Sequence, residues 1–208
     1  FNLPASDDYA ITLDGAPAGY AVKESYTFTG NTAKISLTSS LIEGESLSGA
    51  TLGLGDVMYD FTVTNQAGEE ITLSEVLAEK KMVLLNFFFT TCSPCITEFP
   101  YMQEAYEEYS DDVELIAMNA VNTDADAVKD FQETNGYTFP MALCDSRWGA
   151  VIGAQAYPTT IVIDRYGNIC LIHTGMVTEA ESLKTMLDYF TSDSYEQEFF
   201  KTMSQIPA

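Results

Sequence analysis

The chain has 208 residues, 46% of them hydrophobic, which is enough for one well-packed domain with an appendage. Its 31 Asp and Glu residues against nine Lys and Arg give a net charge of -22, which repels nucleic acids and anionic lipid surfaces, so we expect no nucleic-acid binding. The longest apolar run, residues 82–89, is too short to cross a bilayer and fits a core strand.

The first 54 residues are rich in Thr, Ser, Gly and Ala, and they contain three segments in which apolar and polar residues alternate. These segments are residues 10–13, 20–29 and 33–38, separated by Asp14-Gly15 and Gly30-Asn31. Alternation between turn residues predicts short strands. A segment of this size buries little surface alone, so we expect residues 1–54 to form a small β-rich extension that leans on the main domain or pairs with its edge.

Strands and helices alternate regularly between residues 55 and 190. We predict strands at residues 59–63, 70–73, 82–89, 113–118, 139–144, 159–164 and 168–173, and helices at 74–79, 93–110, 124–134, 148–154 and 178–190. Ser74 is expected to cap the first of these helices, and Pro100 to kink the second. This order predicts an α/β domain over residues 55–190, with a mixed central sheet flanked by helices, and residues 191–208 form a helical tail.

Two cysteines stand where the strand at residues 82–89 gives way to a helix. Cys92 is expected at the exposed helix start, where unpaired N–H groups and the helix dipole favour a thiolate, and it is the candidate nucleophile. Cys95, one turn further in, is the candidate resolving cysteine. Pro94 falls in the first helical turn and stiffens the loop.

Three other interpretations of the pair stay open. Half of a zinc site would need two more ligands, and the chain offers only Cys144, Cys170 and His173. A purely structural disulfide across so small a loop would stabilise the fold weakly. A vestigial motif is the third.

The Cys92-Ser93-Pro94-Cys95 sequence after the first central strand, together with Tyr157-Pro158-Thr159-Thr160 before the last hairpin, resembles the thioredoxin-like fold over residues 55–190. The resemblance implies a cis Tyr157–Pro158 bond that faces the cysteines and presents the backbone of Tyr157 to an extended substrate strand. A trans proline opening an edge strand is the alternative from local sequence. We expect the substrate to contact Thr91, Ser93 and Pro94 beside the cysteines, and Tyr157 and Pro158 opposite them.

Glu98-Phe99-Pro100 after the second cysteine matches the CxxCxxEFP pattern of the extracytoplasmic branch related to TlpA and ResA, whose domain is of the AhpC/TSA-Redoxin type. Asn86 stands where thioredoxin has a buried aspartate. Glu98 lies one helical turn after Cys95, so we expect an acid–base role for it; a solvated helix carboxylate is the alternative. Family members generally have a tryptophan shortly before the first cysteine, where this chain has Thr90-Thr91, so its docking surface differs in shape and polarity.

Three further residues with reactive side chains lie outside this motif. We interpret Cys144 and Cys170 as buried free thiols on strands, and a second structural disulfide between them is the alternative. His173 is interpreted as a surface residue of a strand rather than a catalyst.

The resemblance implies a thiol-disulfide oxidoreductase that reduces protein disulfides outside the cytoplasm, works as a monomer and is recharged by a membrane electron donor of the thiol-disulfide type. We expect no cofactor besides the Cys92–Cys95 disulfide and no metal. The start at Phe1, without methionine, is compatible with removal of a signal or membrane anchor.

Four other functions compete with disulfide reduction. An oxidant would run the same residues in reverse, and a scaffold would use the N-terminal extension as its binding surface. A peroxide reductase is less compatible, because Phe89 and Leu85 replace the Thr and Pro of the peroxiredoxin pattern. A copper-handling Sco-like protein would need a different cysteine spacing.

Overall fold

The computed structural model describes residues 52–121, 124–144, 148 and 156–195, together with the backbone of four short N-terminal strands. These four strands form two antiparallel pairs: β1 (Asp8–Ile11) with β3 (Tyr26–Thr29), and β2 (Tyr20–Ala21) with β4 (Ser40–Leu41). None of them joins the large sheet, so the predicted edge pairing is not seen in them. The strand predicted at residues 33–38, most of the helix at 148–154 and the tail beyond residue 195 lie outside the described residues.

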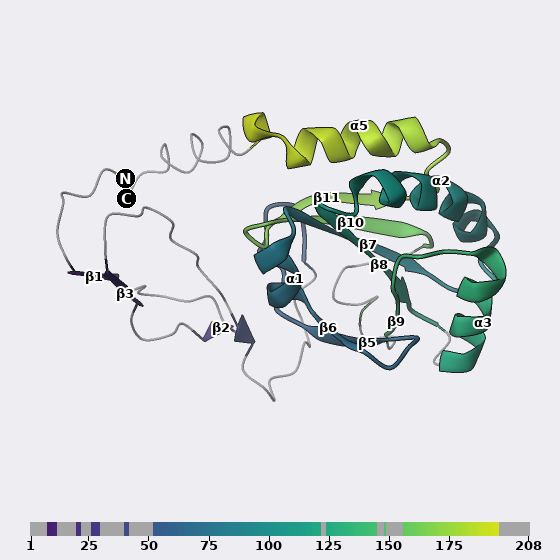
Figure 1. The fold of residues 1–208 in the computed structure, drawn as a ribbon, viewed down its shortest axis with the longest axis horizontal. Helices are drawn as coiled ribbons and strands as arrows, with labels where there is room; N and C mark the ends of the chain where they lie inside the picture. The colour runs from purple at the N-terminus through teal and green to yellow at the C-terminus, as the bar shows by residue number, and fades with distance from the viewer. Residues whose placement is uncertain are drawn as a thin grey trace.

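A seven-stranded mixed sheet forms the centre of the domain (Figure 1). Its order is β11 (Ile169–Thr174), β10 (Thr159–Asp164), β7 (Met82–Phe88), β8 (Val113–Asn119), β9 (Met141–Leu143), β5 (Thr62–Asn65) and β6 (Glu70–Thr72). The three strands β7, β8 and β9 are parallel, and the outer strands pair antiparallel. The predicted thioredoxin-like α/β fold with a mixed sheet is therefore confirmed.

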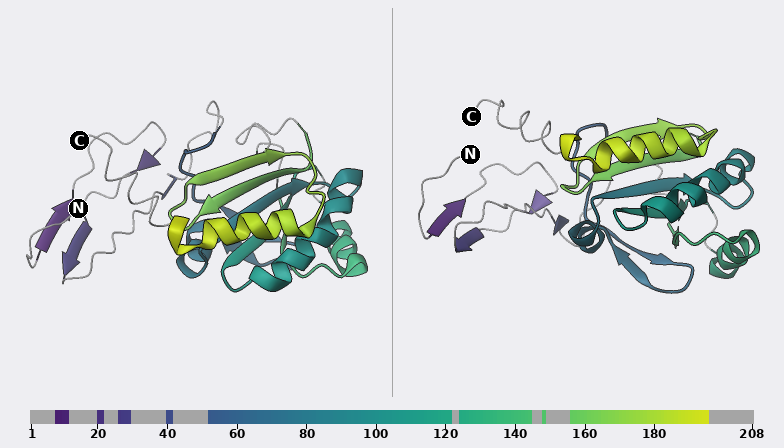
Figure 2. Two further views of the ribbon diagram at one scale, coloured as in Figure 1. Left: turned by 90° about the horizontal axis from the view of Figure 1, so that it is seen from above. Right: turned by 45° about the horizontal axis from the view of Figure 1, so that its top comes forward.

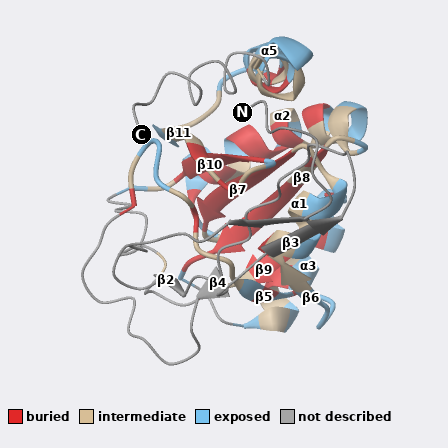
Figure 3. Ribbon diagram, turned by 90° about the vertical axis from the view of Figure 1, so that its left-hand side faces the viewer, coloured by how far each residue is buried: buried red, intermediate tan, exposed pale blue. Residues whose placement is uncertain are grey.

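The strand β7 lies in the middle of this sheet and is buried along its whole length (Figure 3). Because side chains alternate between the two faces of a strand, Leu84 and Phe88 enter one apolar cluster, and Leu85 and Phe87 enter another. Asn86 shares the face of Leu84 and Phe88. The one polar residue of β7 therefore points toward the helix that carries the cysteines.

Helices cover both faces of the sheet. The helices α2 (Ser93–Tyr109), α3 (Ala125–Asn135) and α5 (Ala180–Thr191) pack on the face of Asn86, and α5 lies along α2 (Figure 2). The helix α1 (Leu73–Glu79) packs on the other face. Among the described residues, no helix has the length and apolarity needed to span a bilayer.

Some predicted boundaries were wrong. The helix α1 begins at Leu73, one residue early, and Ser74 does not cap it; the backbone N–H of Ser74 instead donates to the Asp60 carboxylate at 2.9 Å. The strand β5 runs from Thr62 to Asn65 instead of over residues 59–63, and the Asn65 side chain accepts from the backbone of the turn that follows it. The helix α2 continues through Pro100, where the kink stays a prediction.

Candidate active site

The two cysteines form a disulfide at the N-terminus of α2, with their Cα atoms 5.3 Å apart. Cys92 is the residue that caps the helix, and its sulfur accepts a hydrogen bond from the backbone N–H of Cys95 at 3.3 Å. Backbone donors are therefore available to a charge on the Cys92 sulfur. The prediction of an exposed Cys92 was wrong for this oxidised form: Cys92 is only 4% exposed and Cys95 is fully buried.

The residues beside the sulfurs form an exposed rim. Thr91, Ser93 and Pro94 are all exposed, and Pro94 lies in the first turn of α2 as predicted. A partner therefore meets these three side chains before it reaches a sulfur atom. Their contact with substrate remains a proposal.

The register of the sheet places Pro158 at the end of β7 that leads to the cysteines. Thr159 pairs with Phe87 in the antiparallel β10–β7 ladder, so Pro158 stands beside the end of β7, and β7 ends four residues before Cys92. The Tyr157–Pro158 peptide bond is cis, as predicted, and Pro158 is buried. The Tyr157 ring packs edge-on against Phe89, with the ring centres 5.6 Å apart. This aromatic pair packs against the buried cluster that contains both cysteines, in a chain that lacks the tryptophan usual before the first cysteine.

Glu98 is completely buried one turn after Cys95, so the interpretation as a solvated carboxylate was wrong. Two donors reach its carboxyl group from different elements. The Asn86 side-chain amide of β7 donates to Oε1, and the backbone N–H of Val177, in the loop between β11 and α5, donates to Oε2; both distances are 2.8 Å. Asn86 also donates to the Thr160 hydroxyl of β10 at 3.0 Å.

Burial is the main influence on the protonation of Glu98. Removal from water penalises the charged form and raises the pKa of Glu98 from 4.5 to about 7, while the hydrogen bonds from Val177 and Asn86 favour the carboxylate and limit the rise. A pKa near neutral lies in the range that suits a general acid or base.

The remaining reactive side chains lie apart from this group. Neither Cys144 nor Cys170 forms a disulfide, so the alternative of a second disulfide was wrong. Cys144 is buried, as expected, and donates to the backbone carbonyl of Asn119. Cys170 is only partly buried and lies 2.8 Å from the Tyr195 hydroxyl; burial raises its pKa to about 11. His173 is exposed on β11, as predicted.

Two residues that form the hydrogen-bond network of Glu98, Thr160 and Val177, were not predicted from the sequence. Thr160 belongs to the quoted Pro158-Thr159-Thr160 segment, and its register opposite Asn86 follows once β7 and β10 are paired. Val177 contributes its main chain, so no residue type marks it. In the part of the chain that the structure describes, no cluster of three or more His, Cys, Asp or Glu residues is arranged to hold a metal.

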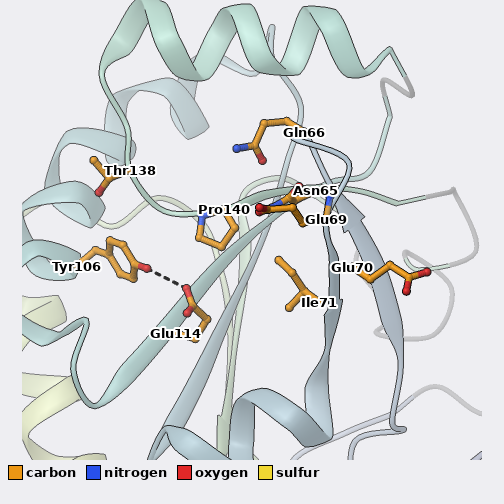
Figure 4. Close-up of a pocket in the computed structure, with 9 residues that line it drawn as sticks. All are labelled: Asn65, Gln66, Glu69, Glu70, Ile71, Tyr106, Glu114, Thr138 and Pro140. Atoms are coloured by element: carbon orange, nitrogen blue, oxygen red, sulfur yellow. Dashed lines mark hydrogen bonds between the residues drawn. The ribbon is translucent and has the colours of Figure 1, made fainter.

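A cavity of about 490 Å³ lies elsewhere, between the β5–β6 hairpin, the last turn of α2, the start of β8 and the segment before β9 (Figure 4). Carboxylates and polar groups dominate its wall, with Glu69, Glu70 and Glu114 among them. The Tyr106 hydroxyl donates to Glu114 at 3.0 Å across this wall. None of the predicted site residues lines the cavity.

Comparisons with known proteins agree with this geometry. A family model described as Redoxin matches residues 54–187. The chain is 38% identical over 128 residues to the thiol-disulfide oxidoreductase ResA of Halalkalibacterium halodurans, covering 60% of this chain and 70% of that protein. It is 35% identical over 129 residues to the thioredoxin-like protein YneN of Bacillus subtilis, covering 61% and 75%.

The fold is also similar to that of a solved structure. The crystal structure of a protein described as the thiol:disulfide interchange protein DsbE from Chlorobium tepidum superimposes with a TM-score of 0.60 and 25% identity. The match covers 68% of this chain and the whole of that one. The residues that the Redoxin family model matches include both cysteines of the disulfide.

Proposed function

We propose that this chain, which belongs to the Redoxin family and is a thiol-disulfide oxidoreductase, reduces the disulfides of partner proteins outside the cytoplasm. The observation that carries the proposal is the Cys92–Cys95 disulfide at the N-terminus of α2, with the buried carboxyl group of Glu98 one turn further along. The family membership gives the chemistry, and the direction, the partner and the location are our inferences.

The reduced protein starts the reaction. The Cys92 thiolate attacks one sulfur of the substrate disulfide, which forms a mixed disulfide and releases the other substrate sulfur as a thiolate. Cys95 then passes its proton to the Glu98 carboxylate and attacks the Cys92 sulfur. This step closes the Cys92–Cys95 disulfide and releases the second substrate thiolate. Two electrons have passed from the protein to the substrate.

A new cycle needs a dithiol donor. A membrane protein of the thiol-disulfide type would attack the Cys92–Cys95 disulfide, reduce it, and carry the electrons from inside the cell. During this half-reaction Glu98 returns its proton to Cys95. The proposed cycle needs no cofactor besides the two cysteines.

The substrate is expected to approach the exposed rim of Thr91, Ser93 and Pro94. On the opposite side, we expect the backbone of Tyr157 to pair with an extended substrate strand, which the cis Tyr157–Pro158 bond supports. The Phe89–Tyr157 pair supplies the apolar part of this surface.

Insulin reduction tests the activity. We expect the wild-type protein, supplied with a dithiol, to reduce insulin disulfides, and Cys92→Ala to abolish the reaction. Cys95→Ser should instead accumulate a mixed disulfide with the substrate, because the attack by Cys92 remains possible and the release does not. The matched controls are Cys144→Ser and Cys170→Ser, which remove the free thiols and should retain activity. A wild-type protein that does not reduce insulin would contradict the proposal.

The reduction potential of the Cys92–Cys95 couple decides the direction. A value near that of thioredoxin, about -270 mV, supports a reductant, whereas a value near that of DsbA, about -120 mV, identifies an oxidant. Treatment of intact cells with a membrane-impermeant thiol reagent tests the location. Labelling of reduced Cys92 supports action outside the cytoplasm, and labelling only after lysis rejects it.

A further inference from the structure

Only the nitrogen end of the Asn86 side-chain amide makes hydrogen bonds to the described residues. Asn86 is fully buried, and its Nδ2 donates to Glu98 Oε1 at 2.8 Å and to Thr160 Oγ1 at 3.0 Å. Its carbonyl oxygen Oδ1 is also buried but has no hydrogen-bond partner among the described residues. Nothing on the carbonyl side therefore holds the amide in its present orientation.

Asn65, another buried asparagine, shows the contrast. Its Oδ1 accepts from the backbone N–H groups of Ala67 and Glu69, both at 2.9 Å, and its Nδ2 donates to the Glu69 carboxylate. Reversal of this amide would break all three bonds. The orientation of Asn65 is fixed by the main chain, whereas that of Asn86 depends on Glu98 and Thr160.

The present arrangement suits the carboxylate form of Glu98. Each of its two oxygens accepts from an N–H donor, Oε1 from Asn86 and Oε2 from Val177. A protonated carboxyl group carries an O–H of its own, which needs an acceptor. The N–H of Val177 belongs to the main chain and cannot become one. The Asn86 amide can, by rotation of its last side-chain torsion, which exchanges oxygen and nitrogen at almost unchanged volume.

Thr160, the third group of this hydrogen-bond network, can bond to the Asn86 amide in either orientation. The Thr160 hydroxyl accepts from Asn86 Nδ2 now, and a hydroxyl also donates, so it can donate to Oδ1 after the amide turns. The turned amide would then accept two hydrogen bonds, from the Glu98 carboxyl group and from Thr160. In the present orientation Nδ2 makes hydrogen bonds and Oδ1 makes none. After reversal Oδ1 would make two hydrogen bonds and Nδ2 would make none.

We propose that Asn86 is a positioning residue whose side-chain amide reverses when Glu98 takes up a proton, so that it donates to the carboxylate and accepts from the carboxylic acid. This inference rests on the proposed acid–base role of Glu98. Its consequence is that the carboxyl group is held in place in both protonation states. Glu98 can then give a proton to Cys95 and take it back without leaving its buried position.

Glu98 is the group whose protonation drives the reversal. The elements around it carry other titratable or charged groups. Tyr157 precedes β10, His173 lies on β11, and Glu179, Glu181 and Lys184 lie on or just before α5. Asp164, Cys170 and Asp188 lie further along β10, β11 and α5. His173, Glu179 and Glu181 are exposed, and Lys184 is engaged by Glu104 and Glu108 at 2.9 Å. The Cys92–Cys95 disulfide does not titrate. Burial already places the pKa of Glu98 at about 7.

Nuclear magnetic resonance of the oxidised wild-type protein tests the inference. The side-chain carboxyl carbon of Glu98 reports its protonation, and the two amide protons of Asn86 report the hydrogen bonds that the amide donates. As the pH falls, we expect both amide protons to shift with the midpoint of the Glu98 carbon, because reversal breaks both donated bonds. The amide protons of Asn65 should not follow that midpoint.

Three results would overturn the inference. If only the amide proton that faces Glu98 shifts, the amide stays in place and merely senses the lost charge. If neither proton shifts, the orientation is independent of Glu98. If the Glu98 carbon does not titrate across the neutral range, nothing drives a reversal.

The variant Glu98→Gln provides the control, because it cannot titrate and should abolish the pH dependence of the Asn86 signals. Asn86→Leu removes the donor that favours the carboxylate, and it should move the pH midpoint of disulfide reduction upward. Since the titration needs no substrate, its failure is distinct from that of the proposed function. Insulin reduction by the wild type can fail while the Asn86 signals behave as expected, and the reverse can also occur.

Discussion

At the scale of single residues, Glu98 combines two opposing influences on one carboxyl group. Burial favours the neutral acid, and the N–H groups of Asn86 and Val177 favour the charged form. Burial dominates, so the folded protein holds the proton at a higher pH than the unfolded chain does. The catalytic suitability of Glu98 near neutral pH therefore has a cost in stability.

That cost predicts a pH dependence of folding. The pKa of Glu98 is about 7 in the folded protein against 4.5 for an unperturbed group. Between these values the folded state binds more protons, so the free energy of unfolding falls as the pH rises from 4.5 and levels off above 7. The contribution is on the order of 3 kcal/mol for a shift of this size. Glu98→Gln should remove it.

Denaturant unfolding of the oxidised wild type and of Glu98→Gln, at pH values below 4.5 and above 7, measures this contribution. The variant should gain stability relative to the wild type as the pH rises. The exposed substitution Glu107→Gln serves as the control and should produce no such relative gain. A constant difference between wild type and Glu98→Gln at all pH values would contradict the prediction.

Some residues of the candidate site could be predicted from the sequence, and others could not. Cys92 and Cys95 follow from a local motif, because the chemistry needs two cysteines at that spacing. The cis Tyr157–Pro158 bond was implied by the resemblance to the thioredoxin-like fold, since local sequence also allowed a trans proline. The burial of Glu98 does not follow from a local motif, because it depends on the loop after β11 folding over α2. Val177 could not be found in the sequence at all, since its contribution comes from the backbone.

At the scale of elements, α2 is held to the sheet and to α3 by an aromatic cluster centred on Phe99. The ring centre of Phe99 lies 4.9 Å from that of Phe88, 5.3 Å from Tyr137, 5.5 Å from Phe139 and 6.1 Å from Phe131. Phe99 follows Glu98 directly, so the same helical turn places the carboxyl group and anchors the helix.

Truncation of Phe99 should be strongly destabilising. Phe99→Ala leaves a cavity in a fully buried cluster, and we expect a loss of about 3–5 kcal/mol in the free energy of unfolding. Val121→Ala, at a side chain that is 62% exposed, should change the same quantity by less than ~0.5 kcal/mol. Urea unfolding of both variants measures the two effects. Equal losses would show that α2 is not anchored through this cluster.

Regular elements were predicted more accurately than irregular ones. The strands β7, β8, β10 and β11 and the helices α2 and α3 lie within a residue or two of their predicted bounds, because each is a long apolar run or a long amphipathic segment. The strand β5 and the start of α1 were displaced. There the side chains of Asn65 and Asp60 satisfy backbone N–H groups, and such contacts leave no periodic pattern.

At the scale of the whole molecule, the net charge of -22 should influence which partners the protein meets. Long-range attraction raises the rate of encounter with positive substrates and lowers it with negative ones, and salt screens both effects. This influence acts before any contact at the disulfide is made.

Two peptide disulfides, one flanked by lysines and one by glutamates, test this expectation. As sodium chloride is added, kcat/KM should fall for the lysine peptide and rise for the glutamate peptide, because screening removes attraction from one and repulsion from the other. A small uncharged disulfide provides the reference. The same salt response in all three substrates would show that the overall charge does not select partners.

The hydrogen bond from Val177 to Glu98 also bears on how freely this protein can vary in evolution. Since every amino acid except proline carries a backbone N–H, the donor survives almost any substitution at position 177. Saturation mutagenesis under selection for activity should therefore accept many residues there and reject proline. A strong preference for valine would contradict this expectation. Part of the active site would thus be invisible to any search for conserved side chains.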